Sequence, residues 1–209
     1  RLERAQLLAR AGLYDLAEWE LRYEGRASAQ AHILALEAAR LAVRRGAPDQ
    51  GIRYIKSLYP GYVNLPLSPV TLPLLKLAYP LPYKDEVLTH AFKNEVDPYL
   101  VAGLIRQESE FSSGAVSRSN AHGLMQIMPR TGRELARRLS LPGFSRQALF
   151  QPQTNVQMGT YYFKRLLDSL GGSLAQALAS YNAGKGRVTE WLARREGLAE
   201  GDPAEFIET

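Results

Sequence analysis

Six of the twelve prolines in this chain of 209 residues lie within residues 60–82, and this cluster limits the fold more than any other feature. A proline inside a helix removes a backbone hydrogen bond and clashes with the preceding turn, so no continuous helix crosses this segment. The segment is also rich in leucine, which indicates that it packs as an extended connector against a neighbour. We therefore expect a Pro-rich connector at residues 61–82, between one domain at 1–60 and another at 83–209.

Residues 1–60 predict helical hairpins, because apolar residues recur at helical spacing and glycines interrupt them. Gly12 and Gly46 are 34 residues apart, and each is followed three positions later by an aspartate, Asp15 and Asp49. This is the period of a helix-turn-helix solenoid. Two copies cannot bury a solenoid core on their own, so two unrelated helical pairs remain an equal alternative. Under the solenoid interpretation, further repeats precede Arg1.

Residues 83–209 also read as helical, and the signals for helix ends are local. Asp97 is a predicted cap followed by a proline, Pro129 opens another helix, Thr154 caps a third, and Ser173 caps a fourth that ends at Gly184. No convincing alternating strand is visible. The expected fold class is therefore mainly α.

Composition narrows the function classes. The formal net charge is +5 with a pI near 9.5, which favours anionic partners, but no nucleic-acid-binding pattern accompanies the basic residues. The absence of cysteine excludes disulfides and a cysteine nucleophile, and the three histidines lack metal-ligand spacing. No apolar run reaches the length needed to span a membrane. We expect neither a metal nor a cofactor.

Glu108 is the candidate for chemistry. It continues an apolar helical stripe formed by Val101, Leu104 and Ile105, so it is a candidate for partial burial, which raises the pKa of a carboxyl group. A glutamic acid that stays protonated near neutral pH can donate to a glycosidic oxygen. The stripe alone favours the simpler alternative, in which Glu108 ends the helix and reaches solvent. Glu110 is expected to be a solvated charge.

Two further segments have candidate binding residues. After Gly123, alternate residues Gln126 and Met128 point into a cleft if the segment is extended; the alternative is core methionines beside a surface glutamine. Tyr181 lies on the apolar face of its helix, so its hydroxyl should reach the interior, where a carboxyl group is a good partner. The alternative is an ordinary helix end at Gly184.

The pieces occur in order as three motifs: Gln107-Glu108-Ser109-x-Phe111, Gly123-Leu-Met-Gln-Ile-Met-Pro129 and Tyr181-Asn182-Ala-Gly184-x-x-Arg187-Val188. Together they resemble the catalytic domain of the soluble lytic transglycosylases, which have a lysozyme-like fold. The resemblance covers about residues 80–192, and a helix with Asn155, Gly159 and Tyr162 also agrees with it. Residues 1–60 resemble the superhelical and linker regions that precede this domain in larger members.

The resemblance implies cleavage of the β-1,4 bond between N-acetylmuramic acid and N-acetylglucosamine in peptidoglycan, leaving 1,6-anhydromuramoyl ends. It implies an exported, periplasmic or envelope protein, and we expect it to act as a monomer. Residues 206–209 resemble the start of a longer family segment, so the domain is expected to be incomplete at its C-terminus. By motif, Glu108 is the catalytic acid and then base, and the cleft is lined by Ser109, Ser117, Gln126, Met128, Tyr181 and Asn182.

Carboxylate chemistry agrees with that activity. Retaining and inverting glycosidases both need a second carboxylate, and the sequence offers no good one. A single acid suffices when the N-acetyl oxygen and the 6-hydroxyl of the substrate act as nucleophiles. Two alternatives stay open: a hydrolase of the goose-lysozyme type on the same fold, and a non-catalytic glycan-binding or scaffold module.

Overall fold

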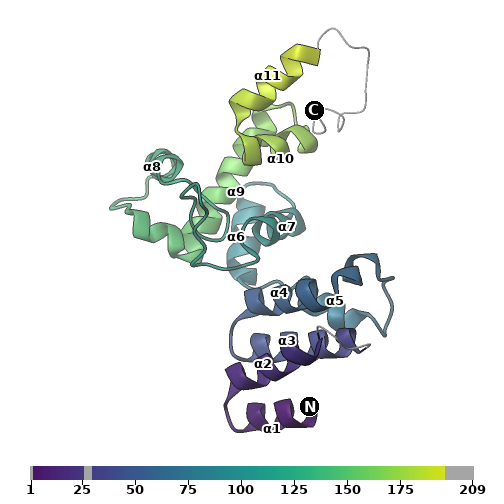
Figure 1. The fold of residues 1–209 in the computed structure, drawn as a ribbon. Helices are drawn as coiled ribbons and strands as arrows, with labels where there is room; N and C mark the ends of the chain where they lie inside the picture. The colour runs from purple at the N-terminus through teal and green to yellow at the C-terminus, as the bar shows by residue number, and fades with distance from the viewer. Residues whose placement is uncertain (1, 26–29, 196–209) are drawn as a thin grey trace. The chain divides into compact units, whose positions relative to one another are not determined.

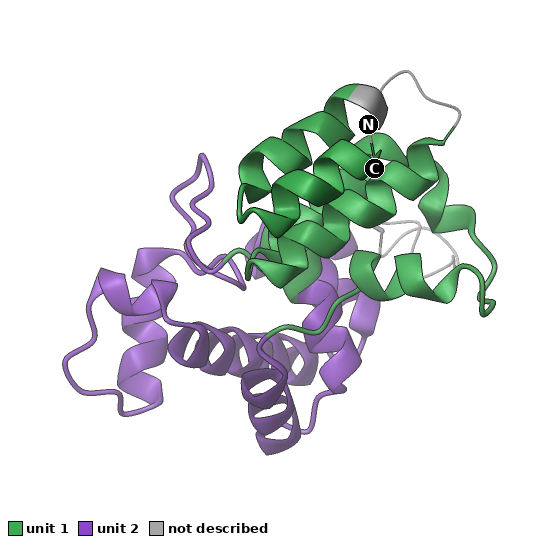
Figure 2. Cartoon of the chain, turned by 90° about the horizontal axis from the view of Figure 1, so that it is seen from below, with its two compact units in different colours: residues 1–82, 105–112 green, residues 83–104, 113–209 purple. Residues whose placement is uncertain are grey.

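The computed structural model describes residues 2–25 and 30–195, and these residues are helical with isolated β-bridges and no strand (Figure 1). The mainly α expectation is therefore confirmed. The chain divides into two compact units (Figure 2). Unit 1 comprises Arg1–Pro82 with Ile105–Ser112, and unit 2 comprises Tyr83–Leu104 with Ser113–Thr209. The three predicted domain ranges stay a prediction. Residues 206–209, with the expected incomplete end, lie outside the described part.

Unit 1 is built from helices that pack against their neighbours in sequence, as predicted for helical hairpins (Figure 1). Its apolar core includes Leu21, Leu34 and Ala38, and the buried Glu18 accepts hydrogen bonds from Arg45 and Tyr54 within it. The elements of unit 1 are α1 (Leu2–Arg10), α2 (Tyr14–Gly25), α3 (Ala31–Arg44), α4 (Pro48–Leu58), the 3₁₀ helix η1 (Pro60–Asn64) and α5 (Leu72–Ala78).

The two hairpin turns of unit 1 have the same geometry. Gly12 has φ +77° and Gly46 has φ +82°, a left-handed conformation that favours glycine. After each glycine, a backbone N–H reaches back five residues: Leu13 N donates to Leu8 O, and Ala47 N donates to Ala42 O, each at 2.9 Å. Asp49 lies inside the first turn of α4 and is not its cap, because Pro48 already opens the helix. The solenoid assignment stays a prediction.

The connector at residues 61–82 is not extended throughout, which corrects the sequence-based expectation. Pro60 and Pro73 stand in the first turns of η1 and α5, where the missing N–H costs no hydrogen bond. Leu74 and Ala78 of α5 are buried against Ile55 of α4. Prolines therefore delimit short helices here.

Unit 2 is organised around one long helix, α9, which contacts α6, α8, η2 and α10. α9 begins at Pro152, two residues before the predicted cap Thr154, because proline occupies the first turn. The predicted helix from Ser173 to Gly184 is confirmed, whereas the bounds of α11 were not predicted. The elements are α6 (Lys84–Lys93), α7 (Pro98–Ser109), α8 (Pro129–Arg138), η2 (Arg146–Phe150), α9 (Pro152–Ser169), α10 (Leu174–Ala183) and α11 (Lys185–Arg195). Helix α7 belongs to unit 2 only as far as Leu104.

Candidate active site

Glu108 lies in the last turn of α7, a helix whose start is fixed by the Asp97 side chain accepting from the Tyr99 N–H at 2.8 Å. The carboxyl group is half-buried, and burial raises the pKa of Glu108 above its ordinary value. The predicted direction of this shift is confirmed. Glu108 is thus suited to hold a proton at a pH where an exposed glutamate has lost it.

Arg106 anchors the end of α7 within unit 1. Its Nε donates to the Ala78 carbonyl oxygen at 2.9 Å, and a terminal nitrogen donates to the Tyr62 hydroxyl at 2.7 Å. Its guanidinium also lies 4.3 Å from the centre of the Tyr79 ring. Two hydrogen bonds and a ring contact thereby fix the helical turn that bears Glu108.

Glu110 is a second anchor of the same segment, and the expectation of a solvated charge is wrong. Its carboxylate accepts hydrogen bonds from Lys56 and, at 3.1 Å, from Arg53 of α4. Burial alone would raise the pKa of Glu110, but the hydrogen bonds from Lys56 and Arg53 outweigh it and lower that pKa. Glu110 and Phe111 both have positive φ, at +52° and +65°, so the chain turns sharply directly after α7. The Glu110 carboxylate is therefore paired with two cationic side chains.

In unit 2, the Gly123 loop is closed by its own backbone. His122 and Ile127 exchange two hydrogen bonds of 3.0 Å, and Gly123 N donates to Ala115 O at 2.9 Å. Gly123 has φ +75°, and a Cβ there would lie 2.1 Å from the Leu149 carbonyl oxygen. Only glycine fits this position.

The side chain of Asn155 in α9 binds the backbone of that loop. Its side-chain oxygen accepts from Met125 N at 2.7 Å, and its amide donates to His122 O at 2.9 Å and Leu149 O at 2.7 Å. One turn further along α9, a Cβ on Gly159 would lie 2.4 Å from the Met125 sulfur. The sequence analysis did not predict Asn155 or Gly159 as site residues. The signal that could have identified them was their place beside Tyr162 in the family motif on this helix.

The alternation predicted after Gly123 is present, although its geometry is different. Met125 and Ile127 are buried, whereas Gln126 is half-buried and Met128 is 41% exposed. Gln126 has φ +48°, so a turn and not an extended strand produces the alternation. The Gln126 amide donates to Gly123 O at 2.8 Å.

The remaining predicted binding residues of unit 2 are Ser117, Tyr181 and Asn182. Ser117 Oγ accepts from Ala121 N at 3.0 Å, so this hydroxyl closes a turn. The Tyr181 hydroxyl donates to the Met125 carbonyl oxygen at 2.7 Å, a backbone partner where a carboxyl group was expected. Asn182 is exposed at the end of α10. Unit 2 therefore brings the Gly123 loop and Tyr181 together.

Glu108 and Ser109 belong to unit 1, and the other five predicted residues belong to unit 2. Ser109 is buried, and its hydroxyl donates to Ile105 O at 3.2 Å. Within residues 2–25 and 30–195, no group of three or more His, Asp or Glu side chains could hold a metal ion. No helix of that same part is long and apolar enough to cross a membrane.

Residues 87–201 match the Transglycosylase SLT domain family, and this match covers more than half of the chain. The chain belongs to this family. It is 34% identical over 136 residues to the soluble lytic murein transglycosylase of Escherichia coli, covering 65% of this chain and 21% of that protein. It is also 34% identical over 177 residues to the membrane-bound lytic murein transglycosylase C of Shigella sonnei, covering 80% of this chain and 45% of that protein.

Solved structures agree with this membership. An inactive glutamate-to-glutamine mutant of lytic transglycosylase Slt from Pseudomonas aeruginosa superposes with a TM-score of 0.70 at 27% identity, covering 98% of this chain and 30% of that one. A complex of the 70-kDa soluble lytic transglycosylase with bulgecin A gives a TM-score of 0.68 at 27% identity, covering 91% and 29%. The chain of this SLT-family protein thus spans less than a third of these two solved chains, 21% of the Escherichia coli relative and 45% of the Shigella sonnei relative.

Proposed function

We propose that the chain is a lytic murein transglycosylase that cleaves the β-1,4 bond between N-acetylmuramic acid and N-acetylglucosamine without water. The observation that carries the proposal is the half-buried Glu108 with its raised pKa, at the end of an anchored helix. The names of the relatives support the reaction class. The inactive glutamate-to-glutamine mutant of the Pseudomonas aeruginosa enzyme supports dependence on one glutamate.

In the first step, protonated Glu108 donates its proton to the oxygen of the leaving N-acetylglucosamine as the bond from that oxygen to C1 breaks. The N-acetyl oxygen of the muramoyl sugar stabilises the cationic C1. In the second step, the 6-hydroxyl oxygen bonds to C1 and its proton passes to the Glu108 carboxylate, which restores the acid. Glu110 cannot act as a nucleophile while Lys56 and Arg53 hold it.

Glycan binding is assigned to Ser109, Ser117, Gln126, Met128, Tyr181 and Asn182. Met128 offers an exposed thioether to the apolar face of a sugar, and Asn182 offers an exposed amide. Ser117 and Tyr181 act mainly by holding backbone, through Ala121 and Met125.

The partner that this proposed activity requires is peptidoglycan. We therefore propose that the protein is located in the periplasm or cell envelope and acts there as a monomer. Peptidoglycan carries carboxylates, and the net charge of +5 suits such a polymer.

The test is mass spectrometry of the fragments released from purified sacculi. We expect 1,6-anhydromuramoyl ends, and a loss of about 100-fold or more in their rate of release by Glu108→Gln. Glu190→Gln, which removes an exposed carboxylate from α11, is the matched control and should keep the activity. Reducing ends would identify a hydrolase instead. Sacculus binding with no fragment release by either protein would identify a non-catalytic glycan-binding module.

A further inference from the structure

Arg146 of η2 binds the segment before Gly123 through two side chains. Its Nε donates to Nε2 of His122 at 2.9 Å, and a terminal nitrogen donates to the Asn120 side-chain oxygen at 2.8 Å. The Phe150 ring, from the same short helix, meets the His122 ring edge to face, with 5.1 Å between the ring centres. We refer to Arg146, His122 and Asn120 as the Arg146 clamp, and no step of the proposed reaction uses them.

The backbone of His122 closes the loop that contains Gln126. His122 is fully buried, and the two 3.0 Å hydrogen bonds that it exchanges with Ile127 join the ends of this loop. Met128 is the next residue after Ile127. Gln126 and Met128 are assigned above to glycan binding, so a displacement of His122 also displaces residues that bind glycan.

Asn120 connects the clamp to a third residue assigned to glycan binding, Ser117. Asn120 has φ +66°, a left-handed conformation that asparagine tolerates, and its N–H donates to Ser117 O at 2.9 Å. The hydrogen bond from Arg146 to the Asn120 side chain stabilises this turn. One arginine therefore fixes both the turn with Ser117 and the loop after His122.

The bond between Arg146 and His122 also fixes the protonation state of the ring. A guanidinium group only donates, so Nε2 must keep its lone pair and the ring proton must lie on Nδ1. A proton on Nε2 would remove the acceptor and place a cationic ring against Arg146. Arg146 is the charged group that acts on the ring, from η2, whereas the neutral Asn155 of α9 donates to the His122 carbonyl oxygen.

We propose that Arg146 and His122 are positioning residues that hold the glycan-binding loop in place only while the His122 ring is neutral. The inference rests on the proposed function, because it takes Ser117, Gln126 and Met128 as glycan-binding residues. Neither positioning residue needs to touch the glycan.

The direction of the pH dependence follows from the surroundings of His122. Burial and, after it, the charge of Arg146 lower the pKa of His122, and a backbone group of Asn120 that acts in the opposite direction is outweighed. The clamp is therefore complete above the ordinary histidine pKa of about 6.5 and opens as the pH falls through the lower pKa of His122. Glycan binding should weaken on this acid side.

The experiment measures co-sedimentation with purified sacculi from about pH 8 to about pH 4.5. Every protein has the Glu108→Gln substitution, so neither cleavage nor the titration of Glu108 contributes, and the chain with this substitution alone is the reference chain. Arg146→Gln removes the donor of the clamp. His122→Gln places an amide oxygen, an acceptor that does not titrate, at about the position of Nε2.

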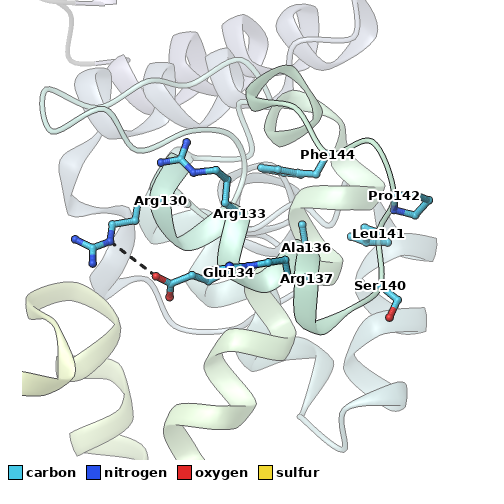
Figure 3. A pocket seen from close by; sticks show the side chains of 9 residues that line it. All are labelled: Arg130, Arg133, Glu134, Ala136, Arg137, Ser140, Leu141, Pro142 and Phe144. Atoms are coloured by element: carbon cyan, nitrogen blue, oxygen red, sulfur yellow. Dashed lines mark ion pairs between the residues drawn. The ribbon is translucent and has the colours of Figure 1, made fainter.

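The matched control is Arg138→Gln. Arginines that line the cavity beside α8 (Figure 3) are avoided as controls, because its volume of about 810 Å³ is large enough for a ligand. Arg138 is exposed on α8, does not line that cavity, and has the same charge as Arg146. It therefore reports what the loss of one surface charge does to binding.

The reference chain should bind sacculi about tenfold more weakly at the acid end than at about pH 8, the effect of losing one hydrogen bond to a charged group. Arg146→Gln should bind about tenfold more weakly at both ends. His122→Gln should bind within about threefold of the reference chain at pH 8 and keep this affinity in acid. Arg138→Gln should follow the reference chain. An Arg146→Gln variant that binds as tightly as the reference chain at pH 8, or an equal acid decline in His122→Gln, overturns the inference.

NMR titration of the His122 ring separates positioning from a general loss of structure. The ring signal is identified by its absence from His122→Gln, and in the reference chain its midpoint should coincide with the midpoint of binding. In Arg146→Gln the ring should titrate at a higher pH than in the reference chain, because the neighbouring cation is gone. Different midpoints for ring and binding contradict the inference without any variant of the clamp. If binding follows the expected pattern but the chain with Glu108 intact releases no 1,6-anhydro ends, the clamp stands and the proposed lytic activity fails.

Discussion

Asn155 is expected to be the residue on which the Gly123 loop depends most, and Asn155→Ala tests this. The side chain is fully buried and makes three hydrogen bonds of 2.7–2.9 Å to the backbone of Met125, His122 and Leu149. Each such bond contributes about 1–1.5 kcal/mol, and alanine leaves the three backbone groups without their partner. The free energy of unfolding should therefore fall by about 3–4.5 kcal/mol.

Urea denaturation followed by circular dichroism measures this change, and hydrogen exchange of the Met125 amide reports on the loop itself. Thr160→Val is the matched control, because Thr160 is also fully buried on α9 and also contacts Met125, through a weak bond of 3.9 Å to its sulfur. Thr160→Val should lower the free energy of unfolding by about 1 kcal/mol or less. If the two variants differ by less than about 1 kcal/mol, Asn155 does not hold the loop as argued.

Four more predictions concern the same segments. Gly123→Ala should destabilise the protein by about 3 kcal/mol or more in urea denaturation, because the new methyl group meets a backbone carbonyl at a position with positive φ. Glu110→Gln should lower the free energy of unfolding by about 1 kcal/mol, and this loss should be less than additive with the loss in Arg53→Gln. The same variant should lower kcat more than it changes KM. The pKa of Glu108 is raised in the folded state, so ionising it opposes folding: Glu108→Gln should stabilise the protein above the unfolded pKa of about 4.5 and lose that advantage below it, as thermal unfolding across pH would show. Cleavage by the original chain should decline only as the pH rises through this raised pKa.

The helix ends that the sequence predicts correctly are those set by neighbouring residues. Ser173 accepts a hydrogen bond from Gln176 N, and Gly184 ends the same helix with φ +91°. The start of α11 was missed because Lys185-Gly186-Arg187 continues the appearance of a turn and contains no cap signal. Local chemistry predicts a helix end well when the partner lies within one turn.

The contacts that the sequence did not predict connect residues far apart in the chain. Glu110 binds Arg53 and Lys56, which precede it by 57 and 54 positions. Asn155 holds Met125 and His122 from 30 and 33 positions away. No periodicity along one helix contains such information. The raised pKa of Glu108 needs only partial burial, for which the apolar stripe of α7 made it a candidate; the stripe alone favoured exposure, and the resemblance of the motifs reversed that choice.

The contacts that anchor Glu108 connect the N-terminal helices to the proposed catalysis. Helix α7 belongs to unit 2 up to Leu104, but from Ile105 its contacts are with unit 1. Arg106 binds the end of α5, and Glu110 binds α4, so the turn between them is fixed on both sides of Glu108. A misplacement of about 1 Å can cost on the order of 100-fold in rate, which is enough for these anchors to affect the rate of cleavage without touching substrate. Unit 1 is therefore expected to set the position and burial of the proposed acid, and through that burial its pKa.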